Sequence, residues 1–180
     1  MSLPEHTSET DIAVVGMSLR VPGAATPDAY WRNVRNGKVS VRELTQAELE
    51  AAGVPAHELA DRHYVRFAAP LDGVGDFDPE FFGFGPKEGA ILDPQHRHLY
   101  ECAWEALEDA GHPPERFDGA IGVFAGCGMP WYFVNNVLTN PALVDSVGLF
   151  LLRHTGNDKD FLATRISYAF DLKGPSVNVQ

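Results

Sequence analysis

Cysteines and basic residues are scarce in this sequence of 180 residues, and their scarcity excludes several classes of protein. The two cysteines, Cys102 and Cys127, form neither a CxxC pair nor a disulfide framework, so a reducing cytoplasm is the expected compartment. Lysine and arginine number 14 against 25 aspartates and glutamates, which gives a net charge of −11. Nucleic acids and anionic membrane surfaces bind clustered basic side chains, and neither is therefore an expected partner.

Long hydrophobic runs are also missing. The longest, Val147–Leu152, contains a glycine and is far too short to span a bilayer. The first residues lack the basic start and apolar stretch of a signal peptide. The apolar content of 44% is nevertheless enough for a folded core. We expect a polar, flexible segment over residues 1–10 and a folded region over 11–180.

Strand and helix patterns alternate along the chain, which favours an α/β layered fold. Short apolar runs at 12–16 and 120–125 are typical of strands buried on both faces. The clearest helix covers 93–110, with Asp93 as its cap and an apolar row at helical spacing. The last residues, 176–180, alternate and predict a strand.

Shorter patterns predict further elements. Thr26-Pro27 opens a helix that ends at Asn36, and Thr45 with Glu48 predicts a capped helix to Ala52. Asp78-Pro79 is expected to start a short helix that carries Phe81 and Phe82. A helix near 131–138 and a helix capped by Asn157 are also expected.

Cys127 is the candidate for chemistry, because it follows a predicted buried strand and lies between two glycines. A nucleophilic cysteine needs a base, and no neighbouring residue identifies one, so a small residue in a pocket wall is the other interpretation. Cys102 falls on the apolar face of its helix and is interpreted as core. His96 and His98 point to different faces of the same helix, so no metal site is expected.

Five sequence blocks, in this order, resemble those of β-ketoacyl synthases (ketosynthases) of the modular polyketide type. The resemblance covers 11–180, and its blocks are Asp11–Ala24, Tyr30–Gly37, Phe77–Gly83, Leu92–Arg97 with Trp104–Gly111, and Lys159–Tyr168 with Gly174–Val177. It implies part of the N-terminal half of a thiolase-like fold, in which βαβαβ units form layers. The implied reaction is a decarboxylative Claisen condensation of a carrier-bound acyl chain with a malonyl-type extender.

The same resemblance implies an acyl carrier protein with its phosphopantetheine arm as partner, the remainder of the ketosynthase, and a homodimer. No cofactor is expected to bind directly. Gly126–Met129 resembles the loop that lines the acyl pocket, so Met129 and Cys127 are the implied substrate-binding residues. The terminal strand, with Val177, Asn178, Val179 and Gln180, resembles the strand that pairs with its twin across the dimer axis.

The family's nucleophilic cysteine would follow Gln180, and none of the seven histidines falls in a matching motif. We therefore expect no catalytic residue within this chain and no activity from it alone. Two alternatives stay open at this point. One is a non-catalytic protein that docks onto a ketosynthase or carrier protein, and the other is an independent thiol enzyme that uses Cys127.

Overall fold

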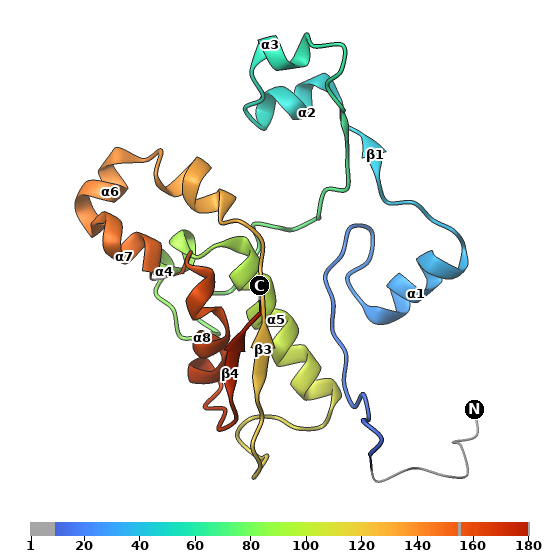
Figure 1. Cartoon of the computed structure of the whole chain (residues 1–180), viewed down its shortest axis with the longest axis vertical. Coiled ribbons are helices and arrows are strands. Elements are labelled where there is room, and N and C mark those ends of the chain that lie inside the picture. The colour runs from blue at the N-terminus through green and yellow to red at the C-terminus, as the bar shows by residue number, and fades with distance from the viewer. Residues whose placement is uncertain (1–9, 155, 180) are drawn as a thin grey trace. The chain divides into compact units, whose positions relative to one another are not determined.

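The computed structural model describes residues 10–154 and 156–179 and divides into two compact units. The smaller unit is Leu19–Phe77, and the larger unit comprises the described residues up to Ser18 and those from Asp78 onward. Figure 1 shows the course of the chain through both. The predicted flexible segment falls almost entirely on residues 1–9, which lie outside the described residues.

Short capped helices and one strand pair form the smaller unit. The Thr26 hydroxyl accepts a hydrogen bond from Ala29 N at 3.2 Å, which confirms the predicted start of the first helix. Thr45 and Glu48 form the predicted capping box, and Arg42 pairs with Glu48 at 2.6 Å. The elements are α1 Pro27–Arg35, β1 Arg42–Glu43, α2 Gln46–Ala51, α3 Ala56–Leu59 and β2 Phe67–Ala68, with β1 and β2 antiparallel.

A parallel strand pair covered by a helix organises the larger unit (Figure 1). Strand β3 (Val123–Ala125) pairs with β4 (Ser176–Asn178), and helix α8 (Leu162–Ala169) packs against both. Leu162 and Ala163 are buried against Ala125 in the core between helix and strands. This βα arrangement confirms the expected α/β class. The other elements are α4 Pro86–Ile91, α5 Pro94–Asp109, the π-helix η1 Phe133–Val137, α6 Pro141–Val147, α7 Leu149–His154 and the 3-10 helix η2 Lys159–Phe161.

Helix α5 begins as predicted, with the Asp93 carboxylate accepting a hydrogen bond from Gln95 N at 2.9 Å. Its buried residues, however, are His96, Arg97 and Tyr100 rather than the predicted apolar row, which is only half-buried. Tyr100 packs into an aromatic cluster, and Arg97 donates to the Leu92 carbonyl at 2.8 Å at the end of α4. The ring packing of Tyr100 and the hydrogen bond of the Arg97 guanidinium thus determine which side chains of α5 are buried.

A second core lies where α4, η1 and α7 meet. Its buried members are Ile91, Phe133, Val137 and Leu152. The predicted helix near 131–138 is present as η1 with its flanking turns. No helix within the described residues is both long and apolar enough to cross a membrane.

The predicted strand at 12–16 is wrong. This segment is extended, and Ile12 is 95% exposed, because no other described segment forms a strand ladder with it. It is held instead along α5, where Met17 N donates to Asp109 at 2.9 Å. At Gly16 a Cβ would lie 2.3 Å from the Ala106 carbonyl, so only glycine permits this approach.

Two local helix predictions also fail. Asp78 accepts a hydrogen bond from Phe81 N at 3.1 Å, but the residues that follow form turns, and the next helix starts only at Pro86. Asn157 does not cap a helix, because its buried side-chain oxygen accepts no hydrogen bond among the described residues. Its side-chain nitrogen donates instead to the Ile91 and Leu152 carbonyls at 2.9 and 2.8 Å. Asp158 is the cap of η2 instead.

Candidate functional site

The loop Gly126–Met129 leaves the carboxyl end of β3 beside the end of β4. Val179 N donates to the Ala125 carbonyl at 2.8 Å, which extends the parallel pairing by one residue. A Cβ at Gly126 would lie 2.3 Å from the Val179 carbonyl oxygen, so a larger residue would push the loop away from the strand. Gly126 therefore allows the loop to stay close to the last strand and sets the position of Cys127, the next residue.

Gln95, in the first turn of α5, holds this loop through two hydrogen bonds. Its side-chain oxygen accepts from Gly128 N at 2.8 Å, and its side-chain nitrogen donates to the Met129 carbonyl at 3.3 Å. Gln95 N is itself held by the Asp93 cap. The helix start and the loop are thus connected as one hydrogen-bonded unit.

Cys127 faces the buried imidazole of His96. The distance between Cys127 Sγ and His96 Nε2 is 4.0 Å, and the imidazole is only 1% exposed. Cys127 is half-buried and packs against the core formed by Ala125, Leu162 and Ala163. The structure therefore brings together a thiol and an imidazole that lie 31 residues apart in the sequence.

The electrostatics keep both groups neutral. Burial lowers the pKa of His96 to about 4, against the opposing effect of the Asp93 carboxylate. Burial raises the pKa of the Cys127 thiol, and the Asp93 charge adds to this rise. The lowered pKa of His96 and the raised pKa of Cys127 both disfavour a thiolate–imidazolium pair, so this environment does not activate Cys127 as a nucleophile.

Met129, the other predicted substrate-binding residue, is 60% exposed at the end of the loop. Its backbone is fixed through Gln95, whereas its side chain is free to meet a ligand. Two cavities, of about 540 and 460 Å³, lie elsewhere in the unit, beside the aromatic cluster of α5 and α8. Among the residues that the structure describes, no group of three or more histidine, cysteine or acidic side chains could hold a metal ion.

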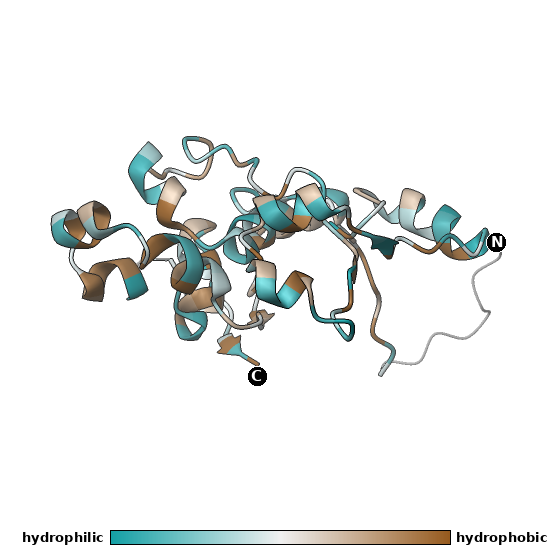
Figure 2. Ribbon diagram, turned by 90° about the horizontal axis from the view of Figure 1, so that it is seen from above, coloured by the Kyte–Doolittle hydropathy of each residue, from teal (hydrophilic) through white to brown (hydrophobic). Residues whose placement is uncertain are grey.

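The predicted dimer residues follow one another along the last strand. Val177 and Val179 are 42% and 56% exposed, and Phe124, across from Val177 in the register, is 66% exposed. Figure 2 shows the alternation of hydrophobic and hydrophilic residues along this strand near the end marked C. Asn178 has a role within the unit, because its side-chain oxygen accepts from Ala163 N at 2.9 Å at the start of α8. Gln180 lies outside the described residues.

Sequence reasoning missed Gln95 as a support of the loop and His96 as the neighbour of Cys127. The only local signal was that both follow the Asp93 cap on the first turn of α5. Gln95 contacts the loop, and His96 contacts Cys127, only because α5, α8 and β3 pack together.

A family profile described as "Beta-ketoacyl synthase, N-terminal domain" matches residues 9–180. A phenolphthiocerol/phthiocerol polyketide synthase of Mycobacterium tuberculosis is 50% identical over 189 residues, which cover 100% of this chain and 12% of the relative. The pikromycin polyketide synthase component PikAII of Streptomyces venezuelae is 39% identical over 93% of this chain and 4% of its own length. The chain thus spans a small part of the curated relatives it matches.

Solved structures give the same result. Ketosynthase twelve of the bacillaene polyketide synthase from Bacillus amyloliquefaciens matches with a TM-score of 0.73 and 32% identity over 93% of this chain and 29% of its own. The oxazolomycin ketosynthase domain OzmH KS7 from Streptomyces albus has a TM-score of 0.72 at 29% identity. The predicted fold, part of the N-terminal half of a thiolase-like fold, is confirmed by these neighbours.

Proposed function

Because this chain belongs to the β-ketoacyl synthase family, we propose that it supplies the N-terminal part of a ketosynthase that extends polyketides. The reaction is a decarboxylative Claisen condensation between an acyl chain and a malonyl-type extender. Both substrates arrive on the phosphopantetheine arm of an acyl carrier protein, and the enzyme acts in the cytoplasm. The observation that carries the proposal is the family match over residues 9–180.

A chimaera tests the proposal. This chain replaces the matching segment of the mycobacterial polyketide synthase to which it is 50% identical. We expect the chimaera to form a dimer and to retain condensation of a carrier-bound acyl chain with its extender. A dimeric, folded chimaera without condensation would overturn the proposal, and a chimaera that does not fold is replaced by one built in the Streptomyces relative.

The chain by itself is proposed to be inactive. Its two cysteines are a half-buried helix residue, Cys102, and Cys127, whose pKa is raised. The raised pKa of Cys127 disfavours the thiolate that thioester attack requires. Incubation of the 180-residue chain with an acyl thioester, followed by intact-mass measurement, is expected to show no stable acylation. Turnover that disappears in Cys127→Ala but not in Cys102→Ala would contradict this.

Within the complete enzyme, the proposed role of the 126–129 loop is to form one wall of the acyl pocket. Support comes from the exposed side chain of Met129 on a backbone that Gln95 holds in place. Cys127 contributes a small, neutral side chain to the same wall.

The last strand is proposed to pair with its counterpart across a homodimer axis. Val177 and Val179 present exposed apolar side chains, and Asn178 ties the strand to α8. A polar replacement at Val177 is therefore expected to weaken dimerisation of the chimaera. Light scattering that shows an unchanged dimer for Val177→Asp would contradict this role.

A further inference from the structure

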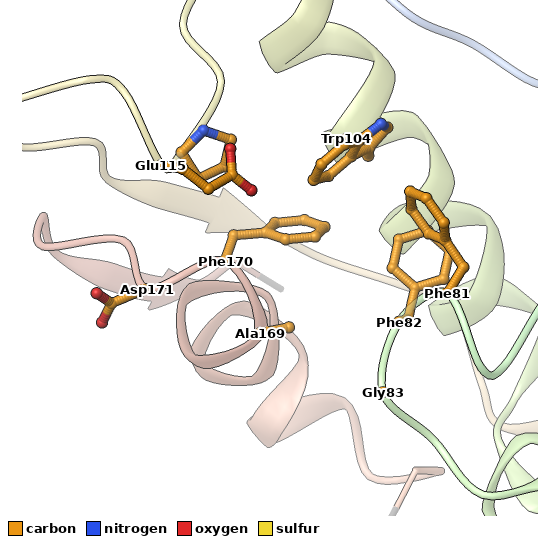
Figure 3. Close-up of a pocket in the computed structure, with 9 residues that line it drawn as sticks. Phe81, Phe82, Gly83, Trp104, Glu115, Ala169, Phe170 and Asp171 are labelled. Atoms are coloured by element: carbon orange, nitrogen blue, oxygen red, sulfur yellow. The ribbon is translucent and has the colours of Figure 1, made fainter.

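An aromatic cavity of about 540 Å³ lies in the larger unit, away from the 126–129 loop. Its volume falls within the range of about 300–1,000 Å³ that is typical of sites for small ligands. Its lining comes from the turn after Asp78, from α5 and the segment that follows it, and from the end of α8. Figure 3 shows the rings of Phe81, Phe82, Trp104 and Phe170 grouped around this space.

The rings are held in fixed positions by one another. Phe81 meets Trp104 edge to face, with centroids 5.2 Å apart, and Trp104 lies 5.8 Å from Phe170. Phe170 is 6% exposed, whereas Phe81 is 57% exposed. Rigid rings with accessible faces attract cations through their quadrupoles.

A carboxylate lies at the edge of the same cavity. In Figure 3 the Glu115 carboxylate points toward the ring of Phe170, while Asp171 points away from the rings. Asp171 is paired with Lys173, so its charge is already compensated. Glu115 is exposed and forms no such ion pair among the described residues. Among the residues that line this cavity, the charge without an ion-pair partner is therefore that of the Glu115 carboxylate.

Aromatic faces and a carboxylate together select a planar cation with an apolar stem. A guanidinium stacks on aromatic rings, forms two parallel hydrogen bonds with a carboxylate, and is less strongly hydrated than an ammonium ion. Anionic ligands are repelled by Glu115 and by the net charge of −11. We infer that this cavity binds an arginine side chain presented by a polypeptide partner, with the guanidinium between the rings and Glu115.

A titration of the ¹⁵N-labelled chain tests the inference. The probe is N-acetyl-arginine methylamide, which carries the side chain and the peptide groups of an arginine residue. The signal is the indole N–H of Trp104, assigned with Trp31→Phe and Trp131→Phe. We expect saturable binding that weakens at higher salt, and about tenfold weaker binding of the neutral citrulline analogue, as loss of a cation–π contact and an ion pair implies.

Matched variants locate the site. Glu115→Gln removes the carboxylate at an exposed position and is expected to weaken binding about three- to tenfold. Glu108→Gln makes the same change in charge at an exposed residue that does not line this cavity and is expected to leave binding unchanged. Phe81→Leu is expected to weaken binding through loss of a ring.

Several outcomes would overturn the inference. These are equal affinity for the arginine and citrulline analogues, equal effects of Glu115→Gln and Glu108→Gln, and no saturation of the Trp104 signal. Stronger binding of free arginine than of the peptide analogue would also count against a polypeptide partner. None of these outcomes depends on condensation activity, so the inference stands or falls separately from the proposed function.

Discussion

The buried imidazole of His96 makes the stability of this protein depend on pH in a predictable direction. Its pKa is about 4 in the folded chain and 6.5 when unperturbed, a difference of about 2.5 units. Each unit corresponds to about 1.4 kcal/mol, so the full effect is about 3 kcal/mol. The unfolded chain takes up the proton below pH 6.5, whereas the folded chain stays neutral until about pH 4. Stability present above pH 6.5 is therefore lost as the pH falls toward 4.

Urea unfolding of the chain and of His96→Gln, followed by circular dichroism between about pH 7.5 and 4.5, measures this effect. Glutamine keeps polarity at the site but cannot take up a proton. Between about pH 6.5 and 4.5 the chain is expected to lose about 2–3 kcal/mol more stability than the variant loses. His57→Gln, at an exposed position in the smaller unit, controls for removal of a histidine as such. Parallel pH profiles for the chain and His96→Gln would refute the assignment of a buried, neutral imidazole.

Three further predictions concern the core and the loop. Leu162→Ala, at a 1% exposed position, is expected to cost about 2–5 kcal/mol in urea unfolding, whereas Leu151→Ala, at a 54% exposed position, is expected to cost less than about 1 kcal/mol. Equal losses would contradict the placement of α8. Gly126→Ala is expected to lower the thermal midpoint, because its Cβ would meet a backbone carbonyl at 2.3 Å, and an unchanged melt would contradict that contact. Gln95→Leu in the chimaera is expected to alter the preference among acyl chain lengths, and Met129→Trp is expected to do the same, while condensation of the shortest acyl chain persists. An unchanged preference in Gln95→Leu would show that the hydrogen bonds of Gln95 to Gly128 and Met129 do not position the loop.

Local signals predicted the helix starts well. The Thr26, Thr45 and Asp93 caps all lie where the sequence placed them, since an N-cap needs only a side chain and the next three backbone N–H groups. The apolar run at 12–16 was misassigned, because a strand needs a neighbouring strand, which the sequence pattern does not supply. Asp78 was misassigned for a related reason, since the same Asp-Pro pattern begins a turn as readily as a helix.

The candidate site was predictable only in part. The predicted strand and the flanking glycines singled out Cys127, and family resemblance added Met129; their assignment to the acyl pocket remains a proposal. The contacts of Gln95 with the loop and of His96 with Cys127 join residues more than 30 positions apart. Such contacts depend on how α5 packs beside β3 and α8, which neither periodicity nor capping rules specify.

The location of the acyl group during catalysis tests the central claim most directly. The chimaera is loaded with an acyl thioester, digested, and mapped by mass spectrometry, with Cys127→Ala measured beside it. The claim that this chain supplies scaffold and pocket, but not the nucleophile, predicts an acyl group on a cysteine outside residues 1–180. It also predicts equal loading of the Cys127→Ala variant. An acyl group on Cys127 in an enzyme that turns over, with loading lost in the variant, would contradict it.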